Sequence, residues 1–218
     1  MQAPPQNVEG VTLVIATTNR DKLREIRALL ADVPVRLRSL ADHPSIPEPE
    51  ETGATFEANA RLKAITYAAA LRAALDDDAL VVAEDSGLVV DALDGAPGVH
   101  SARFLGAEAA YPARFAEIER RLAARPDAPR TARFVCALVA ADRHGTVRFE
   151  TRGVIEGRVA GAPAGQDGFG YDPIFFYPPY GRTLAEVSSE EKRAVSHRGQ
   201  AFRAFAAWLR TTGRSPST

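Results

Sequence analysis

Apolar runs of strand length alternate with helical patterns along the first third of the chain. Val11–Thr17 is a short run of β-branched and apolar residues, which predicts a buried strand. Thr18 and Asn19 then offer N-caps to Arg20–Ala31, where apolar residues recur with helical periodicity. A second strand is predicted over Val35–Leu40, so this part of the chain has the order strand, helix, strand.

The middle of the chain predicts a long helix followed by a strand that polar residues interrupt. Ala41–Thr52 is rich in proline and acidic residues, which favours a loop. The Ala-rich stretch Phe56–Leu75 predicts a long helix. A strand is expected over Leu80–Ala83, with an interruption at Glu84–Gly87 before it resumes over Leu88–Leu93.

The next part predicts a long β-hairpin. A loop rich in glycine and proline at 94–103 and a helix over 112–124 precede two long strands, 131–141 and 146–159, joined by a turn at 142–145. Strands mixed with helices indicate the α/β class, and the hairpin excludes a wholly parallel sheet.

The C-terminal part ends in helices. Residues 160–181 are rich in glycine and aromatic residues, Ser188–Glu191 has a capping-box pattern, and His197–Arg210 predicts a closing helix. We expect one domain over residues 11–210, with a tail at 1–10 and another at 211–218.

Composition narrows the classes of function. The 218 residues carry a formal net charge of −1, so there is no overall basic field for nucleic acid, and a polyanionic ligand must be held by local groups. No apolar run reaches the ~18 residues of a membrane span, and Met1–Gly10 lacks the apolar core of a signal peptide. Cys136 is the only cysteine, which excludes an internal disulfide and fits a small buried side chain. We expect a cytoplasmic protein.

Lysine is scarce in this chain. Of the 27 basic residues only Lys22, Lys63 and Lys192 are lysines. A compact ammonium differs from the planar fork of arginine, so these three positions are candidates for a functional role. The alternative is that they are chance survivors.

The turn between the first strand and the first helix has the composition of an anion site. A helix N-terminus offers unpaired N–H groups and a positive dipole end, which suit a phosphate. Polar side chains that would complete the cradle are Thr17, Thr18, Asn19, Arg20, Asp21 and Lys22. The Walker A pattern is absent, and an ordinary helix cap is the alternative interpretation.

Two adjacent carboxylates, Glu84 and Asp85, follow an apolar strand. Crowding them is costly unless a cation shares them. With Glu50 and Glu51 from the acidic loop they could hold Mg²⁺, which prefers few carboxylates, several waters and substrate phosphates. An acidic β-turn in which Gly87 adopts a positive φ is the alternative.

The segment Gly168–Pro173 combines two glycines, an aromatic ring and an aspartate. Glycine lets the backbone approach a flat ligand, and Phe169 could stack on a base. A structural turn is the alternative.

The segment Lys192–Gly199 gathers hydrogen-bond donors. Its Lys192, His197 and Arg198 lie around the start of the last helix. A solvated basic helix face is the alternative.

Together these segments resemble the inosine triphosphate pyrophosphatase family, the non-canonical purine NTP pyrophosphatases. The matching pieces occur in the family's order; Lys22 and Lys63 fall within them, and Lys192 lies four residues before the last one. They are Thr17-x-Asn19-x-x-Lys22, the segment Glu51–Ala64, Asp85-Ser86-Gly87-Leu88, the segment Gly95–Arg103, Gly168-Phe169-Gly170-Tyr171-Asp172-Pro173 and Ser196-His197-Arg198.

The resemblance implies a long, mixed, twisted sheet between two lobes, a nucleotide cleft between the lobes, and a homodimer. It implies Mg²⁺ and cleavage between the α- and β-phosphates of dITP, ITP or XTP. Asp85 is then the general base and a metal ligand, with Glu50 or Glu51 as a second ligand. Ser86 is a substrate contact, and base and sugar contacts come from Phe169, Gly170, Tyr171, Asp172, Lys192, His197 and Arg198.

Two other functions remain open from the sequence. One is a Maf-like pyrophosphatase that acts on canonical or modified pyrimidine nucleotides, against which the His197-Arg198 pair favours purines. The other is a non-catalytic nucleotide-binding module, against which the carboxylate set favours an enzyme.

Overall fold

The structure is a computed structural model that describes residues 10–212. Most of the two predicted tails therefore lies outside the described residues. Residues 211 and 212 still belong to the last helix, which ends two residues beyond its predicted end. Within residues 10–212 no helix has both the length and the apolar composition to cross a membrane.

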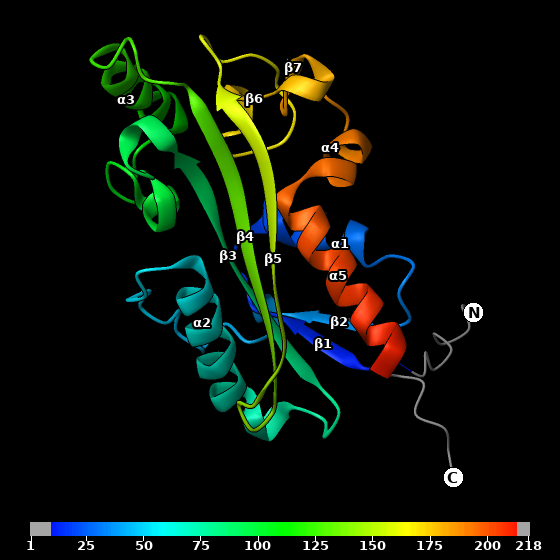
Figure 1. Cartoon of the computed structure of the whole chain (residues 1–218). Coiled ribbons are helices and arrows are strands. Elements are labelled where there is room, and N and C mark those ends of the chain that lie inside the picture. Colours follow the sequence, from blue (N-terminus) through cyan, green and yellow to red (C-terminus); the bar gives the residue numbers. More distant parts are fainter. Residues whose placement is uncertain (1–9, 213–218) are drawn as a thin grey trace, which may run out of the picture.

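Seven strands and five α-helices make up the regular structure of the described residues (Figure 1). The strands are β1 (Thr12–Ile15), β2 (Arg36–Ser39), β3 (Leu80–Val90), β4 (Thr131–Asp142), β5 (Val147–Val159), β6 (Phe175–Tyr177) and β7 (Arg182–Thr183). The helices are α1 (Arg20–Leu29), α2 (Phe56–Leu71), α3 (Tyr111–Ala123), α4 (Ser189–Val195) and α5 (His197–Thr212).

The strands form one mixed sheet in the order β2-β1-β3-β4-β5-β6-β7. β1 pairs in parallel with β2 and β3, and every other pair is antiparallel. The α/β class and the long mixed sheet are thus confirmed. The predicted hairpin is also present, because β4 and β5 pair around a turn in which Gly145 has a φ of +81°.

Three hydrophobic clusters hold the layers together. α2 packs on one face of the central strands through a cluster that includes Tyr67 and Val81. α1 and α5 pack on the other face through a cluster that includes Ile26 and Phe202. A third cluster lies at the far ends of β3–β5 and includes residues of α3 and β6. Figure 1 shows this last group as a second lobe at the top of the molecule, beyond α2 and α5.

The predicted interruption of the third strand is wrong. β3 runs without a break from Leu80 to Val90, and its pairing with β4 continues through Glu84↔Leu138 and Gly87↔Val135. Gly87 supplies close approach and not a positive φ. A Cβ there would lie 2.3 Å from Ser101 Oγ and 2.6 Å from the Gly98 carbonyl oxygen.

Other predicted boundaries shift by a few residues. The predicted helix 56–75 ends at Leu71, and Arg72–Ala74 forms a 3₁₀ turn. The expected loop 94–103 contains a 3₁₀ helix over Gly98–Arg103. The capping box is present as predicted, since the Ser188 and Glu191 side chains each accept a hydrogen bond from the other's backbone N–H.

Candidate functional site

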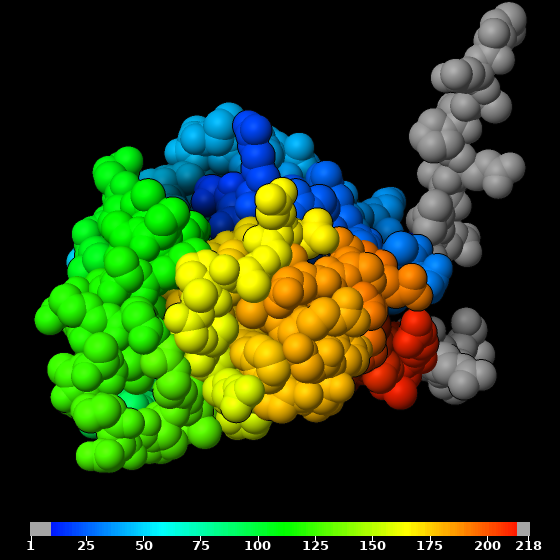
Figure 2. Space-filling view, turned by 90° about the horizontal axis from the view of Figure 1, so that it is seen from above, coloured from blue at the N-terminus to red at the C-terminus, as the bar shows by residue number. Residues whose placement is uncertain are grey.

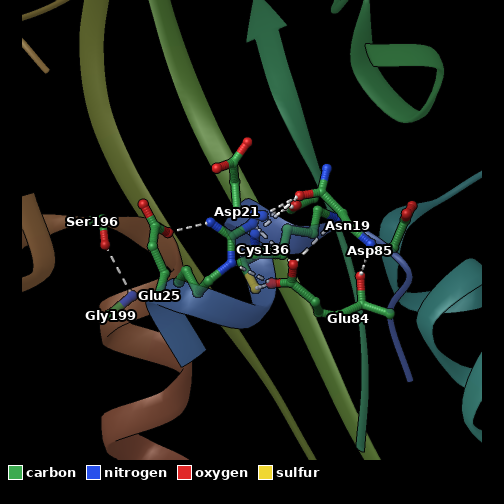
Figure 3. Close-up of polar contacts among 12 residues, drawn as sticks. Asn19, Asp21, Glu25, Glu84, Asp85, Cys136, Ser196 and Gly199 are labelled. Atoms are coloured by element: carbon green, nitrogen blue, oxygen red, sulfur yellow. Dashed lines mark hydrogen bonds and ion pairs between the residues drawn. The ribbon is translucent and has the colours of Figure 1, made fainter. Parts of the chain in front are cut away.

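The continuity of β3 separates the two adjacent carboxylates. Side chains alternate between the faces of a strand, so Glu84 lies on the side of α1 and α5 and Asp85 on the side of α2. Figure 3 shows their carboxylates pointing away from one another. The two acids therefore do not share one cation, and the crowding expected from the sequence does not occur.

Glu84 is the centre of a buried ion-pair network. Its two carboxylate oxygens each accept a 2.9 Å hydrogen bond from Arg198, and Lys22 Nζ lies 3.2 Å from Oε1. The Cys136 thiol donates to Oε2 over 3.0 Å. Burial opposes ionisation of Glu84, but the charges of Arg198 and Lys22 outweigh it and hold the pKa of Glu84 well below its usual range. This carboxylate is an ionised anchor for two cations.

Glu25 is a second anchor, and sequence reasoning missed it. It lies on α1, one turn after Lys22, and accepts hydrogen bonds from Arg198 Nη1 at 2.6 Å and Lys192 Nζ at 2.7 Å. Burial opposes its charge, but Arg198 and Lys192 lower the pKa of Glu25. The three-residue spacing from Lys22 on the helix was the available signal.

The start of α1 is a capped helix as well as a candidate anion site. Asn19 Oδ1 accepts hydrogen bonds of 3.0 Å from the backbone N–H groups of Asp21 and Lys22, and Thr17 Oγ1 accepts one from Asn19. The alternative interpretation of Asn19 as a cap is therefore correct. Asn19 also lines the cleft described next. Thr18 and Arg20 are exposed beside it.

One cleft brings together segments that are far apart in the sequence. Its empty volume is about 540 Å³, part of it open to solvent. Its walls contain ten of the predicted site residues, namely Asn19, Lys22, Ser86, Phe169, Gly170, Tyr171, Asp172, Lys192, His197 and Arg198. In Figure 2 the blue N-terminal, green middle and yellow-to-orange C-terminal surfaces meet on one face of the molecule.

Phe169 lies at the aromatic end of this cleft. Gly168 and Gly170 on either side of it both have positive φ, 72° and 68°, which explains the two glycines. Lys192 Nζ lies 4.6 Å from the centre of the Phe169 ring. Asp172 accepts the Phe169 N–H at 2.8 Å and also binds Lys192, so the loop, the ring and the ammonium form one unit.

His197 lines the cleft and has a ring nitrogen without a hydrogen-bond partner among the described residues. Its ring stacks on Phe134 with centroids 4.9 Å apart, and this nitrogen is the buried Nδ1. Burial and the charge of Arg198 hold the pKa of His197 well below its usual range, so the imidazole is neutral.

The donors of Arg198 are mostly engaged inside the protein. Nε and Nη2 bind Glu84, Nη2 also binds Ser86 Oγ at 3.1 Å, and Nη1 binds Glu25. A guanidinium has five N–H groups, so one of them, on Nη1, is left for a ligand. The sequence suggested a freer donor cluster than the structure contains.

Asp85 and Lys63 form a second cluster on the α2 face of β3. Lys63 Nζ donates to Asp85 Oδ1 at 2.9 Å and to Glu51 Oε1 at 2.8 Å. Asn59, another residue that sequence reasoning left without a role, donates to Asp85 Oδ2 at 3.3 Å. Burial raises the pKa of Asp85, and the charge of Lys63 opposes this rise without cancelling it. Neither Asp85 nor Lys63 lines the cleft, but Ser86, next in the strand, does.

The donor set of this second cluster fits a magnesium ion. Glu51 and Asp85 already converge on one cation, the Lys63 ammonium, and both supply the hard oxygen ligands that Mg²⁺ takes. Glu50 is exposed, and within residues 10–212 no hydrogen bond or ion pair joins its side chain to Glu51 or Asp85. No three acidic, histidine or cysteine side chains of the described residues converge on a metal position, so waters and phosphates would complete the coordination.

Comparison with known proteins assigns this arrangement to a family. Residues 13–208 match the Ham1 family. The chain belongs to the Ham1 family. A curated protein of an Exiguobacterium species, named dITP/XTP pyrophosphatase, is 48% identical over 191 residues, which cover 88% of this chain and 93% of the relative. A protein of Geobacter sulfurreducens with the same name is 47% identical over 87% of this chain and 92% of its own length.

Solved Ham1 structures share the fold. A HAM1 protein from Coxiella burnetii superposes with a TM-score of 0.83 at 37% identity, over 92% of this chain and 99% of that one. The Ham1 protein of Staphylococcus aureus gives 0.79 at 34% identity, with the same coverage. The family expected from the sequence is thus confirmed, and so is the Ham1-type sheet with flanking helices.

Proposed function

We propose that this Ham1 chain hydrolyses non-canonical purine nucleoside triphosphates, namely dITP, ITP and XTP, to the monophosphate and pyrophosphate. The names of its relatives support this reaction. The observation that carries the proposal is the single cleft that joins Lys22, at the start of α1, to the neutral His197 and the Phe169 ring. The triphosphate would lie at the Lys22 end of the cleft, and the purine would lie at the Phe169 end.

Discrimination among bases follows from the donors at the aromatic end. Hypoxanthine and xanthine present an O6 acceptor where adenine presents an N6 donor. The remaining N–H of Arg198 can donate but cannot accept, and Arg198 lines the cleft together with His197. With adenine, the N6 donor would face the Arg198 N–H, and neither group would find an acceptor. This mismatch would cost about 1–3 kcal/mol.

The second cluster, on the α2 face of β3, supplies the groups that bind the metal and activate water. Glu51 and Asp85 would hold Mg²⁺, which when bound neutralises charge on the phosphates. Asp85 orients a water toward the α-phosphorus and takes its proton. Asn59 fixes the Asp85 carboxylate, and Lys63 adds positive charge beside it. Thr17, Thr18, Arg20 and Asp21 stay predictions as substrate contacts.

The test is pyrophosphate release from dITP, XTP, dATP, dGTP, dTTP and UTP with Mg²⁺. We expect dITP and XTP to be preferred over dATP, dTTP and UTP by at least about tenfold in kcat/KM. Equal rates on all six would contradict the specificity. A preference for dTTP and UTP would favour the Maf-like alternative, and tight binding of dITP without turnover would favour a binding module.

The proposal extends to assembly and location. We propose one functional domain over residues 11–210, acting as a cytoplasmic homodimer. In sedimentation we expect a species of twice the 23.4 kDa chain mass. A species at the chain mass across micromolar concentrations would contradict the dimer.

A further inference from the structure

The phenol of Tyr111 is a polar group of the cleft that the proposed reaction does not use. Tyr111 is the first residue of α3 and lies in the cleft wall, with 37% of its surface exposed. Within residues 10–212, hydrogen bonds engage the hydroxyls of Tyr171 and Tyr180 but not that of Tyr111. Its hydroxyl is therefore free to bind a ligand.

The Tyr111 ring is held in a fixed orientation. The ring of Tyr171 meets it edge-on, with centroids 5.3 Å apart and an interplanar angle of 90°. The Arg114 guanidinium lies 4.9 Å from the Tyr111 ring centre. Arg114 is itself buried and fixed by hydrogen bonds of 3.1 Å to the carbonyl oxygens of Ser101 and Gly106. A ring packed in this way presents its hydroxyl with little loss of side-chain entropy on binding.

Tyr111 lines the same cleft as Lys22, at the anion end, and Phe169, at the aromatic end. A Cβ built on Gly170, next to Phe169, would be 3.6 Å from the Tyr111 hydroxyl oxygen, which places it beside the aromatic end. Burial raises the pKa of Tyr111; Arg114 opposes this rise, and the charges of Asp172 and Asp21 add to it. The phenol therefore keeps its proton at neutral pH.

We propose that the Tyr111 hydroxyl hydrogen-bonds a hydroxyl group of the nucleotide sugar. This inference rests on the proposed function, in which the phosphates lie at α1 and the base lies at Phe169. The pentose is the part of a nucleotide between its base and its phosphates, and its polar groups are the 2′- and 3′-hydroxyls. A phenol can donate to either hydroxyl or accept from it.

The experiment compares Tyr111→Phe with the wild type on ITP, dITP and 2′,3′-dideoxy-ITP, by pyrophosphate release and by calorimetric binding. Losing one neutral hydrogen bond lowers kcat/KM and affinity by roughly 3- to 10-fold. We expect that loss on ITP alone if the 2′-hydroxyl is bound, or on ITP and dITP if the 3′-hydroxyl is bound. The dideoxy nucleotide has neither group, so the variant should handle it like the wild type.

Tyr177→Phe is the matched control, because Tyr177 lies in β6 and not in the cleft wall. It should leave all three nucleotides unaffected. An unchanged Tyr111→Phe enzyme, or an equal loss on all three nucleotides, overturns the inference. A wild type that hydrolyses none of them contradicts the proposed function instead, and the binding measurements still decide the role of Tyr111.

Discussion

At the scale of single residues, Glu84 has a different role from the metal-binding role that its place beside Asp85 suggested. The sequence placed both acids at one metal turn, but the strand turns them to opposite faces, and Glu84 pairs with Lys22 and Arg198. Both cations line the cleft. The Glu84 carboxylate is therefore what keeps two positive groups ordered before any nucleotide binds.

Glu84→Gln should destabilise the protein substantially. The change removes the negative charge that balances the buried Arg198 and the partly buried Lys22. We expect this loss to lower the free energy of unfolding by about 3 kcal/mol. Urea denaturation measures it. The control is Glu150→Gln, which breaks an exposed ion pair with Arg61 and should cost less than about 1 kcal/mol. Equal effects of the two changes would contradict a buried anchor.

The lowered pKa of Glu84 also predicts how the stability of the wild type and of Glu84→Gln depends on pH. The pKa of Glu84 is lowered in the folded state from the usual 4.5, so the unfolded chain binds the proton first as the pH falls. The stabilising contribution of Glu84 is complete above pH 4.5 and is lost as the pH falls through the folded-state pKa. The unfolding free energy of the wild type should therefore drop more steeply below pH 4.5 than that of Glu84→Gln. Parallel pH curves would contradict the lowered pKa.

At the scale of elements, the sequence predicted the helices, the β4–β5 hairpin and the strand, helix, strand order of the first third well, because periodicity and turn residues are local signals. It failed at β3. Glu84–Gly87 has the composition of a turn, but pairing with β4 on one side stabilises an extended backbone there. The preference of four residues cannot reveal a partner strand about fifty residues away, so the opposite orientation of the two acids was not predictable.

The crossing of α5 over β5 should be sensitive to one methyl group. A Cβ on Gly153 would lie 2.0 Å from the His197 carbonyl oxygen. Gly153→Ala should therefore cost about 1–3 kcal/mol of stability and displace the start of α5, weakening dITP binding as well. Denaturation and calorimetry measure both effects. Gly161→Ala is the control, since nothing lies within 4 Å of its added Cβ, and a Gly153→Ala protein as stable as that control would contradict the contact.

At the scale of the whole molecule, the fold brings distant segments of the chain to one cleft. Lys22, Phe169, Lys192 and His197, which the sequence predicts as substrate contacts, line this cleft together. Glu25, Asn59 and Tyr111 were missed, since their roles arise from tertiary contacts and not from local composition. Asp85 does not line the cleft, although Ser86 and Gly87 beside it do, so the proposed reaction requires the phosphates to extend from the cleft to Asp85.

The most direct measurement is the turnover and binding of dITP by Asp85→Asn with Mg²⁺, beside the exposed control Asp94→Asn. Asp85 does not line the cleft, so the affinity should stay within a few-fold of the wild type. Pyrophosphate release should fall by at least about 100-fold, the contribution of a positioned general base, while Asp94→Asn behaves like the wild type. Near-wild-type turnover by Asp85→Asn, or a loss of affinity as large as the loss of rate, would contradict the account.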